Sequence, residues 1–332
     1  MEYNLKFTKL CDKLNLGSMT AEPISLTGGH MHKMFALETL TGKYAVKALN
    51  PGVMLRPEAM GNLVNAENIA QISAKHISAA PAKTFNGVAI QEIDGQYYYV
   101  FDWIDGITFS HDNLTVKHSE IMGNILADLH NIDFSSLCLE DDYSYKEYEF
   151  DWDFYLQKGI QAHADWVDLV KNNLANLHDW NKRLIDGSNK LSVGTVISHG
   201  DLEPKNVIWK NNVPIVIDWE AAGFIAPSYD LFETAVYWAK DIQNKIQKDR
   251  FITFINSYKN RNTNLTIDID AVLYKGFVRL GWLEYSLKRS LGLESADEAE
   301  SRMGTDHVFW SINDMLQYEK TIPVLKKWMQ EA

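Results

Sequence analysis

Apolar residues along the chain follow two different periods, and the change between them falls close to residue 102. Before it, β-branched and alternating runs predict strands over residues 24–26, 34–37, 44–49, 84–92 and 97–101, with helices within 1–20 and over 63–77. After it, helical spacing predicts helices over residues 116–131, 160–184, 230–260, 269–292 and 305–331. The pattern therefore predicts an α+β protein with two lobes, residues 1–102 and 103–332, the first built on an antiparallel sheet.

One β-hairpin is predicted inside the helical part, and it carries the most informative side chains. Two β-prone runs, 207–209 and 214–217, flank a pair of asparagines with turn chemistry. Asp201 and Asn206 precede the first strand and Asp218 follows the second, so all three are expected at the same end of the hairpin. Two carboxylates and an amide, all hard oxygen ligands, should therefore converge on one point.

This set of side chains suits phosphoryl transfer. The reaction needs a base that takes a hydroxyl proton and oxygen ligands that hold Mg²⁺ against the nucleotide phosphates. The step from Asp201 to Asn206 equals that of the protein-kinase catalytic loop, and Asp218 stands where the metal-binding aspartate of kinases would. We assign Asp201 as the catalytic base and Asn206 and Asp218 as metal ligands. The simpler alternative is a polar turn before an ordinary hairpin, in which three matched positions would coincide by chance.

The stretch HGDLEPKN, residues 199–206, together with IDWE at 217–220, resembles the aminoglycoside phosphotransferase and choline kinase-like family of small-molecule kinases. The resemblance implies a protein kinase-like two-lobed fold, with a small antiparallel-sheet N-terminal lobe and a mainly helical C-terminal lobe. It implies ATP and Mg²⁺ as cofactors and the hydroxyl of a small molecule as phosphate acceptor. It also makes His199 a catalytic residue beside Asp201, and it implies that Asp230 braces the catalytic loop.

The N-terminal lobe supplies the nucleotide contacts that the resemblance implies. Lys47 lies on a strand that resembles the kinase V-A-I-K strand, whose lysine pairs with the phosphates and with a glutamate on the next helix. Glu67 is our choice for that glutamate, and Glu58 is the rival. In the family the hinge backbone binds the adenine edge, and Asp102 and Ile104 match those hinge positions.

The glycine-containing turn at 27–33 is expected, on the same resemblance, to lie over the nucleotide phosphates. It contains His30 and His32. Two loop histidines without further ligands are more often solvated than metal-bound, so we expect both side chains in solvent.

Two other classes of protein share some of these features. A protein kinase would need an activation segment with an A-P-E anchor, but only eleven residues separate Asp218 from Asp230 and no such anchor is present. A catalytically inactive nucleotide-binding module is the second alternative. It is disfavoured because Lys47, Asp201 and Asn206 accompany Asp218, so that every expected catalytic position is filled.

The acceptor stays open at this point. Glu203 and Lys205 replace the histidine and glycine common in such loops, so the loop does not define a substrate class. Residues 139–155 mix acids with aromatics and would suit an amine such as an aminoglycoside, a choline-like compound or an amino-sugar. The same stretch also fits a helix with one solvated acidic face, in which case a neutral sugar or a macrolide would serve equally well.

Composition limits the partners and the compartment. The net charge of −12 argues against nucleic acid or an anionic membrane as a main partner and slightly favours cationic ligands. Cys11 and Cys138 are too few for a disulfide framework or a thiolate metal site. The start MEYNLKFTKL has no apolar core typical of a signal peptide, and no apolar run approaches the ~18 residues of a membrane span. We therefore expect a cytoplasmic protein.

Overall fold

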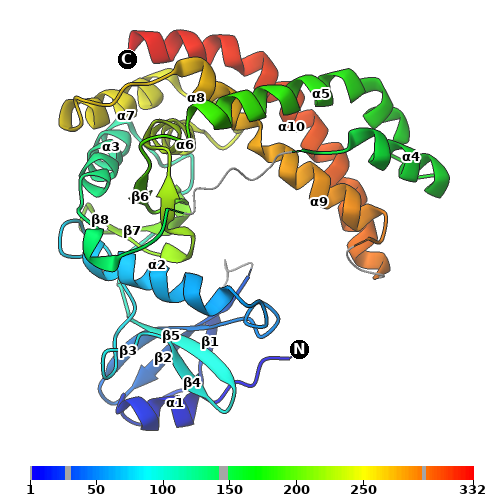
Figure 1. Cartoon of the computed structure of the whole chain (residues 1–332). Coiled ribbons are helices and arrows are strands. Elements are labelled where there is room, and N and C mark those ends of the chain that lie inside the picture. Colours follow the sequence, from blue (N-terminus) through cyan, green and yellow to red (C-terminus); the bar gives the residue numbers. More distant parts are fainter. Residues whose placement is uncertain (1, 27–30, 142–148, 294–296) are drawn as a thin grey trace.

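The computed structural model describes residues 2–26, 31–141, 149–293 and 297–332. Its N-terminal part is a five-stranded antiparallel sheet in the order β1-β2-β3-β5-β4 (Figure 1). The strands are β1 (Ile24–Leu26), β2 (Lys33–Thr39), β3 (Gly42–Ala48), β4 (Gln91–Ile93) and β5 (Gln96–Asp102). The strand expected over 84–92 is therefore mostly loop, and only its last residues pair with β5.

Two helices cover the sheet, α1 (Phe7–Leu14) on one side and α2 (Ala59–Ser73) on the other. Leu10 and Leu14 of α1 join the core formed by the inward side chains of β2, β3 and β5. The other face holds α2 through Leu63, whose carbonyl accepts a hydrogen bond of 2.9 Å from the Tyr99 hydroxyl of β5. Figure 1 shows α2 lying between the sheet and the helical remainder of the chain, so α2 is the helix that can reach both parts.

Helices dominate the chain after β5. They are α3 (Val116–His130), α4 (Trp152–Ala162), α5 (Val167–Lys190), α6 (Pro227–Ala239), α7 (Lys248–Arg261), α8 (Ile269–Lys275), α9 (Leu280–Ser290) and α10 (Glu298–Glu331). Short 3₁₀ turns lie between them: η1 (Ser135–Leu137), η2 (Pro204–Asn206), η3 (Trp219–Ala221) and η4 (Gly276–Arg279). The antiparallel sheet followed by a mainly helical part confirms the expected α+β, protein kinase-like fold class.

The helix expected over 230–260 is in fact two helices, α6 and α7. The break comes at Lys240, whose backbone is extended rather than helical. Arg250, buried on α7, donates to the carbonyls of Ala239 (2.8 Å) and Lys240 (2.6 Å). A helix end leaves its last carbonyls without partners, and this guanidinium satisfies two of them. The contact from Arg250 thus stabilises the end of α6, where periodicity alone predicted a continuous helix.

The predicted hairpin is present as β7 (Val207–Lys210) and β8 (Val213–Val216). Asn211 and Asn212 have φ of 52° and 63°, which is the pair of left-handed residues that a tight hairpin turn requires. A second small sheet pairs β6 (Val196–Ser198) with β9 (Gly223–Ile225). The amide of Val216 donates to the Ser78 carbonyl at 2.9 Å, which ties the hairpin to the segment that follows α2.

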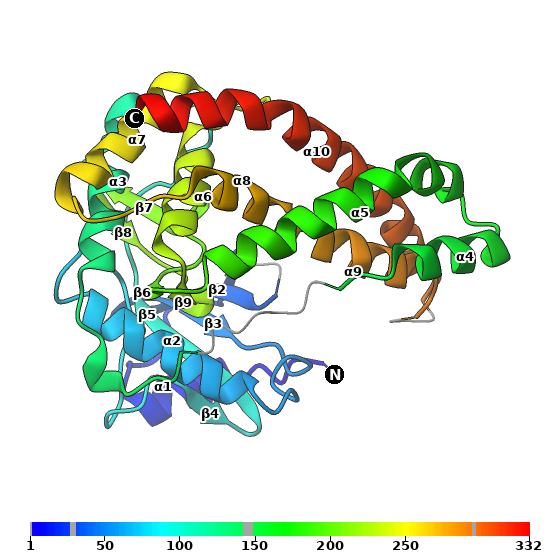
Figure 2. The same ribbon diagram turned by 45° about the horizontal axis from the view of Figure 1, so that its top comes forward.

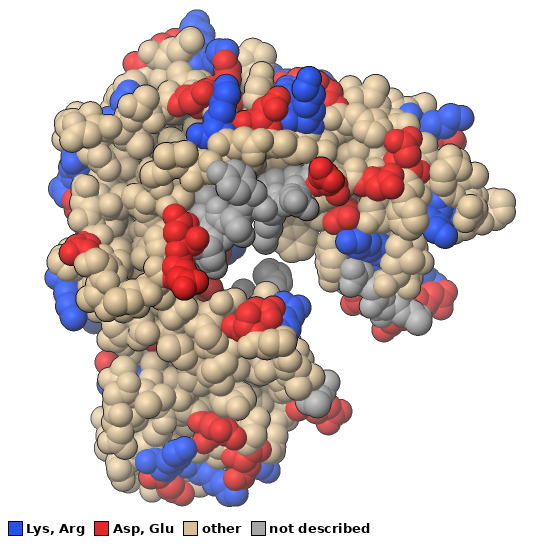
Figure 3. Space-filling view, in the orientation of Figure 1, with Lys and Arg blue, Asp and Glu red and all other residues tan. Residues whose placement is uncertain are grey.

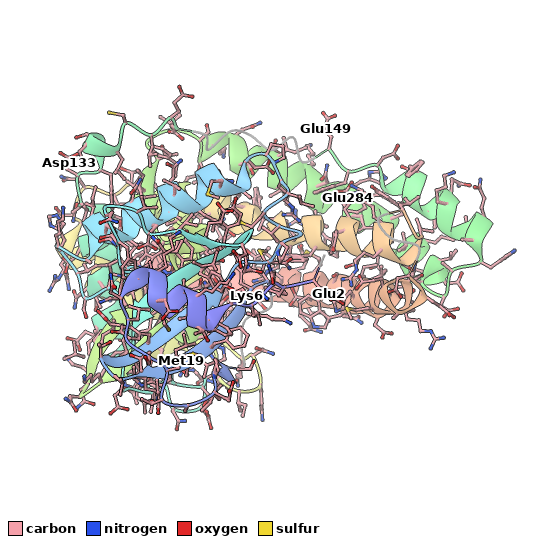
Figure 4. All side chains as sticks on the ribbon, turned by 90° about the horizontal axis from the view of Figure 1, so that it is seen from below. Glu2, Lys6, Met19, Asp133, Glu149 and Glu284 are labelled. Carbon is pink, nitrogen blue, oxygen red and sulfur yellow. The ribbon has the colours of Figure 1, made fainter. Side chains whose placement is uncertain are left out.

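A deep hollow separates the sheet part from the helical part, and Asp and Glu side chains lie on its rim (Figure 3). Turning the molecule shows that α4, α5, α9 and the start of α10 form an arm beyond this hollow (Figure 2). Glu149 and Glu284 both lie toward that arm, away from Met19 and Asp133 (Figure 4). In the described part of the chain, no helix combines the length and apolar character that crossing a membrane requires.

Candidate active site

Lys47 connects the two parts of the molecule. It lies on β3, opposite Tyr99 of β5, with its side chain buried. Its ammonium group is 2.8 Å from the Asp218 carboxylate and 2.7 Å from that of Glu220, both just after β8. Burial lowers the pKa of a lysine, but here the two carboxylates outweigh burial and raise the pKa of Lys47. The lysine is therefore a permanent cation held at the junction.

Glu67 is not the partner of Lys47, which corrects the sequence-based assignment. One carboxylate oxygen of Glu67 instead accepts from the Ala82 amide (2.6 Å) and from the Gln71 side chain (3.3 Å). Burial raises the pKa of Glu67 to about 7, and the nearby Lys47 charge only partly opposes this. The rival Glu58 is exposed at the start of α2. The glutamate that does pair with Lys47 is Glu220, the last residue of the IDWE stretch. Its separation from Lys47 in the sequence gives no sign of this contact.

His32 supports Glu220 from the N-terminal side. It is buried, and its Nδ1 accepts a 2.8 Å hydrogen bond from the Asn50 amide. The proton is therefore on Nε2, which lies 3.3 Å from the Glu220 carboxylate. Burial acts to raise the pKa of Glu220, but its bonds with His32 and Lys47 outweigh burial and bring that pKa down to about 2. The expectation that His32 is solvated is wrong, and His30 lies outside the described residues.

The catalytic loop is held together by its own side chains. The Asn206 amide nitrogen donates to the Asp201 carbonyl (2.8 Å) and to the Asp201 carboxylate (2.9 Å). Asn206 itself is buried, and its backbone carbonyl accepts from the Ile217 amide at 2.9 Å. The bonds from the Asn206 amide orient the Asp201 carboxylate. The bond from the Ile217 amide places the loop beside the end of β8, one residue before Asp218. The side chains of Asp201 and Asn206 are thus in contact, and the Asn206 backbone is bonded to Ile217, the residue directly before Asp218.

His199 links the loop to the residue before Asp218 through both of its ring nitrogens. The ring is fully buried, its Nδ1 accepts from the Asp201 amide (3.2 Å), and its Nε2 donates to the Ile217 carbonyl (3.0 Å). Burial lowers the pKa of His199, which keeps the ring neutral and matches this pattern of one acceptor and one donor nitrogen. Both ring nitrogens are thus engaged with the backbone, and the assignment of His199 as a catalytic residue stays a prediction.

Gly200 lets the loop approach η3. Its φ is +74°, in the left-handed region, and a Cβ built there would lie 2.3 Å from the Ala221 carbonyl oxygen. Asp218 also has left-handed backbone angles, φ 63° and ψ 65°, which are uncommon for residues other than glycine. Its side chain is 44% exposed, so the carboxylate is open to a ligand from the hollow.

Asp230 acts on this loop through a histidine. It lies buried on α6, and its carboxylate accepts a 2.8 Å hydrogen bond from Nε2 of His130 on α3. The same nitrogen is 3.2 Å from the Ser198 hydroxyl, directly before the loop, and Nδ1 of His130 is 2.8 Å from the Tyr258 hydroxyl. The bracing implied for Asp230 is thus indirect. His130 is a supporting residue that sequence reasoning missed, because nothing local marks it.

The hinge residues lie where β5 leaves the sheet. The Asp102 carboxylate accepts from Lys83 at 2.7 Å, while the amide of Trp103 donates to the Lys43 carbonyl at 3.2 Å. The Lys43 ammonium also lies over the Trp103 ring, 4.1 Å from its centroid. These contacts hold the strand end in place next to Ile104. The adenine contact expected at Asp102 and Ile104 stays a prediction.

The residues predicted to hold Mg²⁺ fit a divalent cation. Both amide hydrogens of Asn206 are used on Asp201, so the atom that this side chain can offer a metal is its carbonyl oxygen. Asp218 adds an exposed carboxylate. In the described part of the chain, no three His, Cys, Asp or Glu side chains form a cluster able to hold a metal. Additional oxygen ligands, such as those of nucleotide phosphates, would complete the shell.

A buried lysine that bridges the two parts, with Asp201, Asn206 and Asp218 at one end of a hairpin, matches the order of residues in a kinase catalytic site. The chain belongs to the phosphotransferase enzyme family, whose model matches residues 24–259. This confirms the resemblance seen in the HGDLEPKN and IDWE stretches, and with it the class of small-molecule kinase.

Solved structures share the fold at low sequence identity. A spectinomycin phosphotransferase, in complex with ADP and spectinomycin, aligns at 14% identity and a TM-score of 0.66, covering 95% of this chain and 99% of its own. A microcompartment-associated aminopropanol kinase aligns at 13% identity and a TM-score of 0.64, covering 97% of this chain and 99% of its own. The ethanolamine kinase of Plasmodium vivax aligns at 15% identity and a TM-score of 0.56, covering 87% of this chain and 82% of its own. A comparison with curated protein sequences gives no match.

Proposed function

We propose that the protein transfers the γ-phosphoryl group of ATP to a hydroxyl of a small molecule, with Mg²⁺ as the metal. The observation that carries the proposal is the Asn206 amide, which donates twice to Asp201 and so leaves its carbonyl oxygen for the metal. One side chain thereby aligns the base and ligates the cation. The complex of the spectinomycin phosphotransferase with ADP supports a nucleotide site in this fold.

The nucleotide is proposed to lie between residues 1–102 and 103–332. The hinge backbone at Asp102 and Ile104 would meet the adenine edge, and Lys47 would meet the phosphates. Mg²⁺, held by Asn206 and Asp218, would neutralise charge on the phosphate oxygens. Because Lys47 is paired with Asp218 and Glu220, its ammonium group is already next to Asp218, one of the two proposed metal ligands.

Asp201 would receive the acceptor hydroxyl. One of its carboxylate oxygens, Oδ2, accepts from Asn206 at 2.9 Å and lies 3.5 Å from the Lys205 ammonium. The carboxylate is thus oriented before any acceptor binds, and its other oxygen, Oδ1, is the atom proposed to take the hydroxyl proton. Positioning supplies most of the rate in a loose phosphoryl transition state, and proton transfer adds to it.

An amine on the acceptor is the extension that we favour. The names of two structural relatives, ethanolamine kinase and aminopropanol kinase, each state an amine. In this chain, Glu203 stands two residues after Asp201 and offers a carboxylate near the reacting hydroxyl. The stretch 139–155 was the other candidate for amine binding, and its residues 142–148 lie outside the described residues.

The test is ADP release from ATP and Mg²⁺, measured with a panel of hydroxylated small molecules with and without an amine. Stimulation by at least one acceptor, with a phosphorylated product identified by mass, is the expected result. A catalytically inactive nucleotide-binding module would raise its melting temperature with ATP yet release no ADP with any acceptor, and that outcome would reject the proposal.

A further inference from the structure

A cluster of charged and polar side chains lies near enough to Asp201 for their charges to interact. We call it the acceptor wall, and its members are Glu203, Glu233, Tyr237, Lys240, Arg279 and Asp314. They come from the catalytic loop, α6 and the residue after it, η4 and α10; η4 packs against α10, and electrostatic interactions link Lys240 with Glu203, Glu233, Arg279 and Asp314. Figure 2 shows α6 and α10 on the helical side of the molecule. Tyr237 links the wall to the site. Burial raises its pKa, and so do the nearby carboxylates of Glu233, Glu203 and Asp201.

Most charges in the acceptor wall already have partners. Glu203 pairs with Lys205 at 3.2 Å, and the Arg279 guanidinium pairs with Asp314 at 3.2 Å. Glu233 accepts a 2.8 Å hydrogen bond from the Tyr229 hydroxyl, and burial raises its pKa, which favours its neutral form. These groups satisfy one another, and none of them calls for a ligand.

Lys240 is the exception. Its ammonium lies 5.4 Å from the centroid of the Tyr237 ring, and among the residues that the structure describes it forms neither an ion pair nor a hydrogen bond. The side chain is only partly exposed, and burial, followed by the nearby positive charge of Arg279, lowers the pKa of Lys240. The carboxylates of Asp314, Glu203 and Glu233 act in the opposite direction but do not outweigh these two effects. Because the balance of these effects disfavours the charged form of Lys240, an anion in direct contact with its ammonium group would stabilise that form.

We infer that the acceptor carries an anionic oxygen group, a carboxylate or a phosphate, which pairs with Lys240 while the acceptor hydroxyl lies at Asp201. The position of the hydroxyl rests on the proposed function, but the anion contact rests on the acceptor wall itself. Arg279 is neutralised by Asp314, so among the described residues Lys240 is the cation of the acceptor wall that has no ion-pair partner. A hydroxy amino acid would place its carboxylate at Lys240, and its ammonium group would lie on the side of Glu203.

Calorimetric titration of the full chain with matched pairs of compounds tests the inference. Serine against ethanolamine and threonine against 1-amino-2-propanol differ by one carboxylate, and glycerol phosphate against glycerol differs by one phosphate. The anionic member of at least one pair should bind about 10-fold tighter or more, which is the size of a charge-assisted contact. The pair that shows the preference distinguishes a carboxylate from a phosphate.

Variants assign the preference to its residue. Lys240→Met should abolish the preference for the anionic member, and Lys240→Glu should reverse it. Lys245→Met removes the same charge from an exposed position five residues later and should keep the preference. If Lys240→Met melts below the assay temperature, Lys240→Gln replaces it. Equal binding within every pair, or a preference that survives in these Lys240 variants, overturns the inference.

The same compounds in the ADP-release assay separate this inference from the proposed function. A preference for the anionic member that depends on Lys240, without any ADP release, would support the anion contact and reject phosphotransfer. ADP release only with acceptors that lack an anionic group, together with equal binding within pairs, would support phosphotransfer and reject the anion contact.

Discussion

Lys47 and Glu220 form an ion pair of 2.7 Å between the N-terminal sheet and the turn that follows β8. The Glu220 carboxylate also lies 3.3 Å from His32, so it contacts two side chains of the N-terminal part, His32 and Lys47. Glu220 and Asp218, rather than a glutamate of α2, hold the Lys47 ammonium at the junction of the two parts. It makes Glu220 the residue through which the stability of the lobe junction can be measured.

Glu220→Gln should destabilise the protein by about 1–3 kcal/mol. The change leaves His32 and Lys47 with a weaker, neutral acceptor in a mostly buried place, although Asp218 still neutralises Lys47. Urea unfolding measures the loss. Glu38→Gln is the matched control, because Glu38 pairs with Lys43 at 3.2 Å on the surface and should cost less than about 1 kcal/mol. Equal losses for the two variants would contradict a junction role for Glu220.

Glu67 should make stability depend on pH. Its pKa is raised by burial to about 7 in the folded protein from 4.5, so the folded state holds the proton more tightly than the unfolded state. The stabilisation is present below about pH 4.5 and is lost as the pH rises to about 7. Relative to Glu67→Gln, which keeps the neutral form, wild type should lose on the order of 3 kcal/mol across that window.

The measurement is urea unfolding of wild type and Glu67→Gln at several pH values between 4.5 and 8. Glu58→Gln removes an exposed carboxylate at the start of the same helix and serves as the control. A difference between wild type and Glu67→Gln that stays constant over the whole range would show that Glu67 does not carry this dependence.

Asp201→Asn should lower turnover by roughly 10²-fold or more while ATP affinity changes by no more than a few-fold. The variant keeps the shape of the side chain but removes the base, and the proposed nucleotide contacts lie on other residues. Steady-state kinetics with the acceptor found in the panel, together with ATP titration, check this. Asp186→Asn, exposed on α5, is the control. Near-normal turnover in Asp201→Asn would exclude the base role.

Asp218→Asn should weaken nucleotide binding in the presence of Mg²⁺ and raise the Mg²⁺ concentration needed for half-maximal turnover. The change removes one formal charge from the proposed metal site and from the ion pair with Lys47. Titration of turnover with Mg²⁺ at fixed ATP is the measurement. An unchanged Mg²⁺ requirement would mean that Asp218 is not a ligand.

Gly200→Ala should destabilise the protein by more than about 2 kcal/mol, because alanine disfavours the left-handed backbone and its Cβ would meet a main-chain oxygen at 2.3 Å. Gly61→Ala is the opposite case. Gly61 is on helix α2 with nothing within 4 Å of its added Cβ, so alanine there should stabilise by about 1 kcal/mol. Thermal unfolding of both variants tests the contrast, and similar melting temperatures would refute it.

The sequence by itself determined the hairpin and the side chains at its end. Asn211 and Asn212 favour the turn because asparagine tolerates positive φ. Asp201, Asn206 and Asp218 all lie within a stretch of fewer than twenty residues. Strand alternation near Lys47 and helical spacing after residue 102 likewise depend on neighbours in the chain. Short-range geometry of this kind repeats wherever the same residues occur, so it can be predicted.

Only the tertiary structure decided which groups meet across long separations. Lys47 lies 173 residues before Glu220, and the choice of Glu220 over Glu67 depends on how α2 packs between the two parts. His32 became buried through the same packing. In each case a charged or polar group gains its partner from a distant element, because burial leaves it without water and the nearest acceptor is set by how the elements pack.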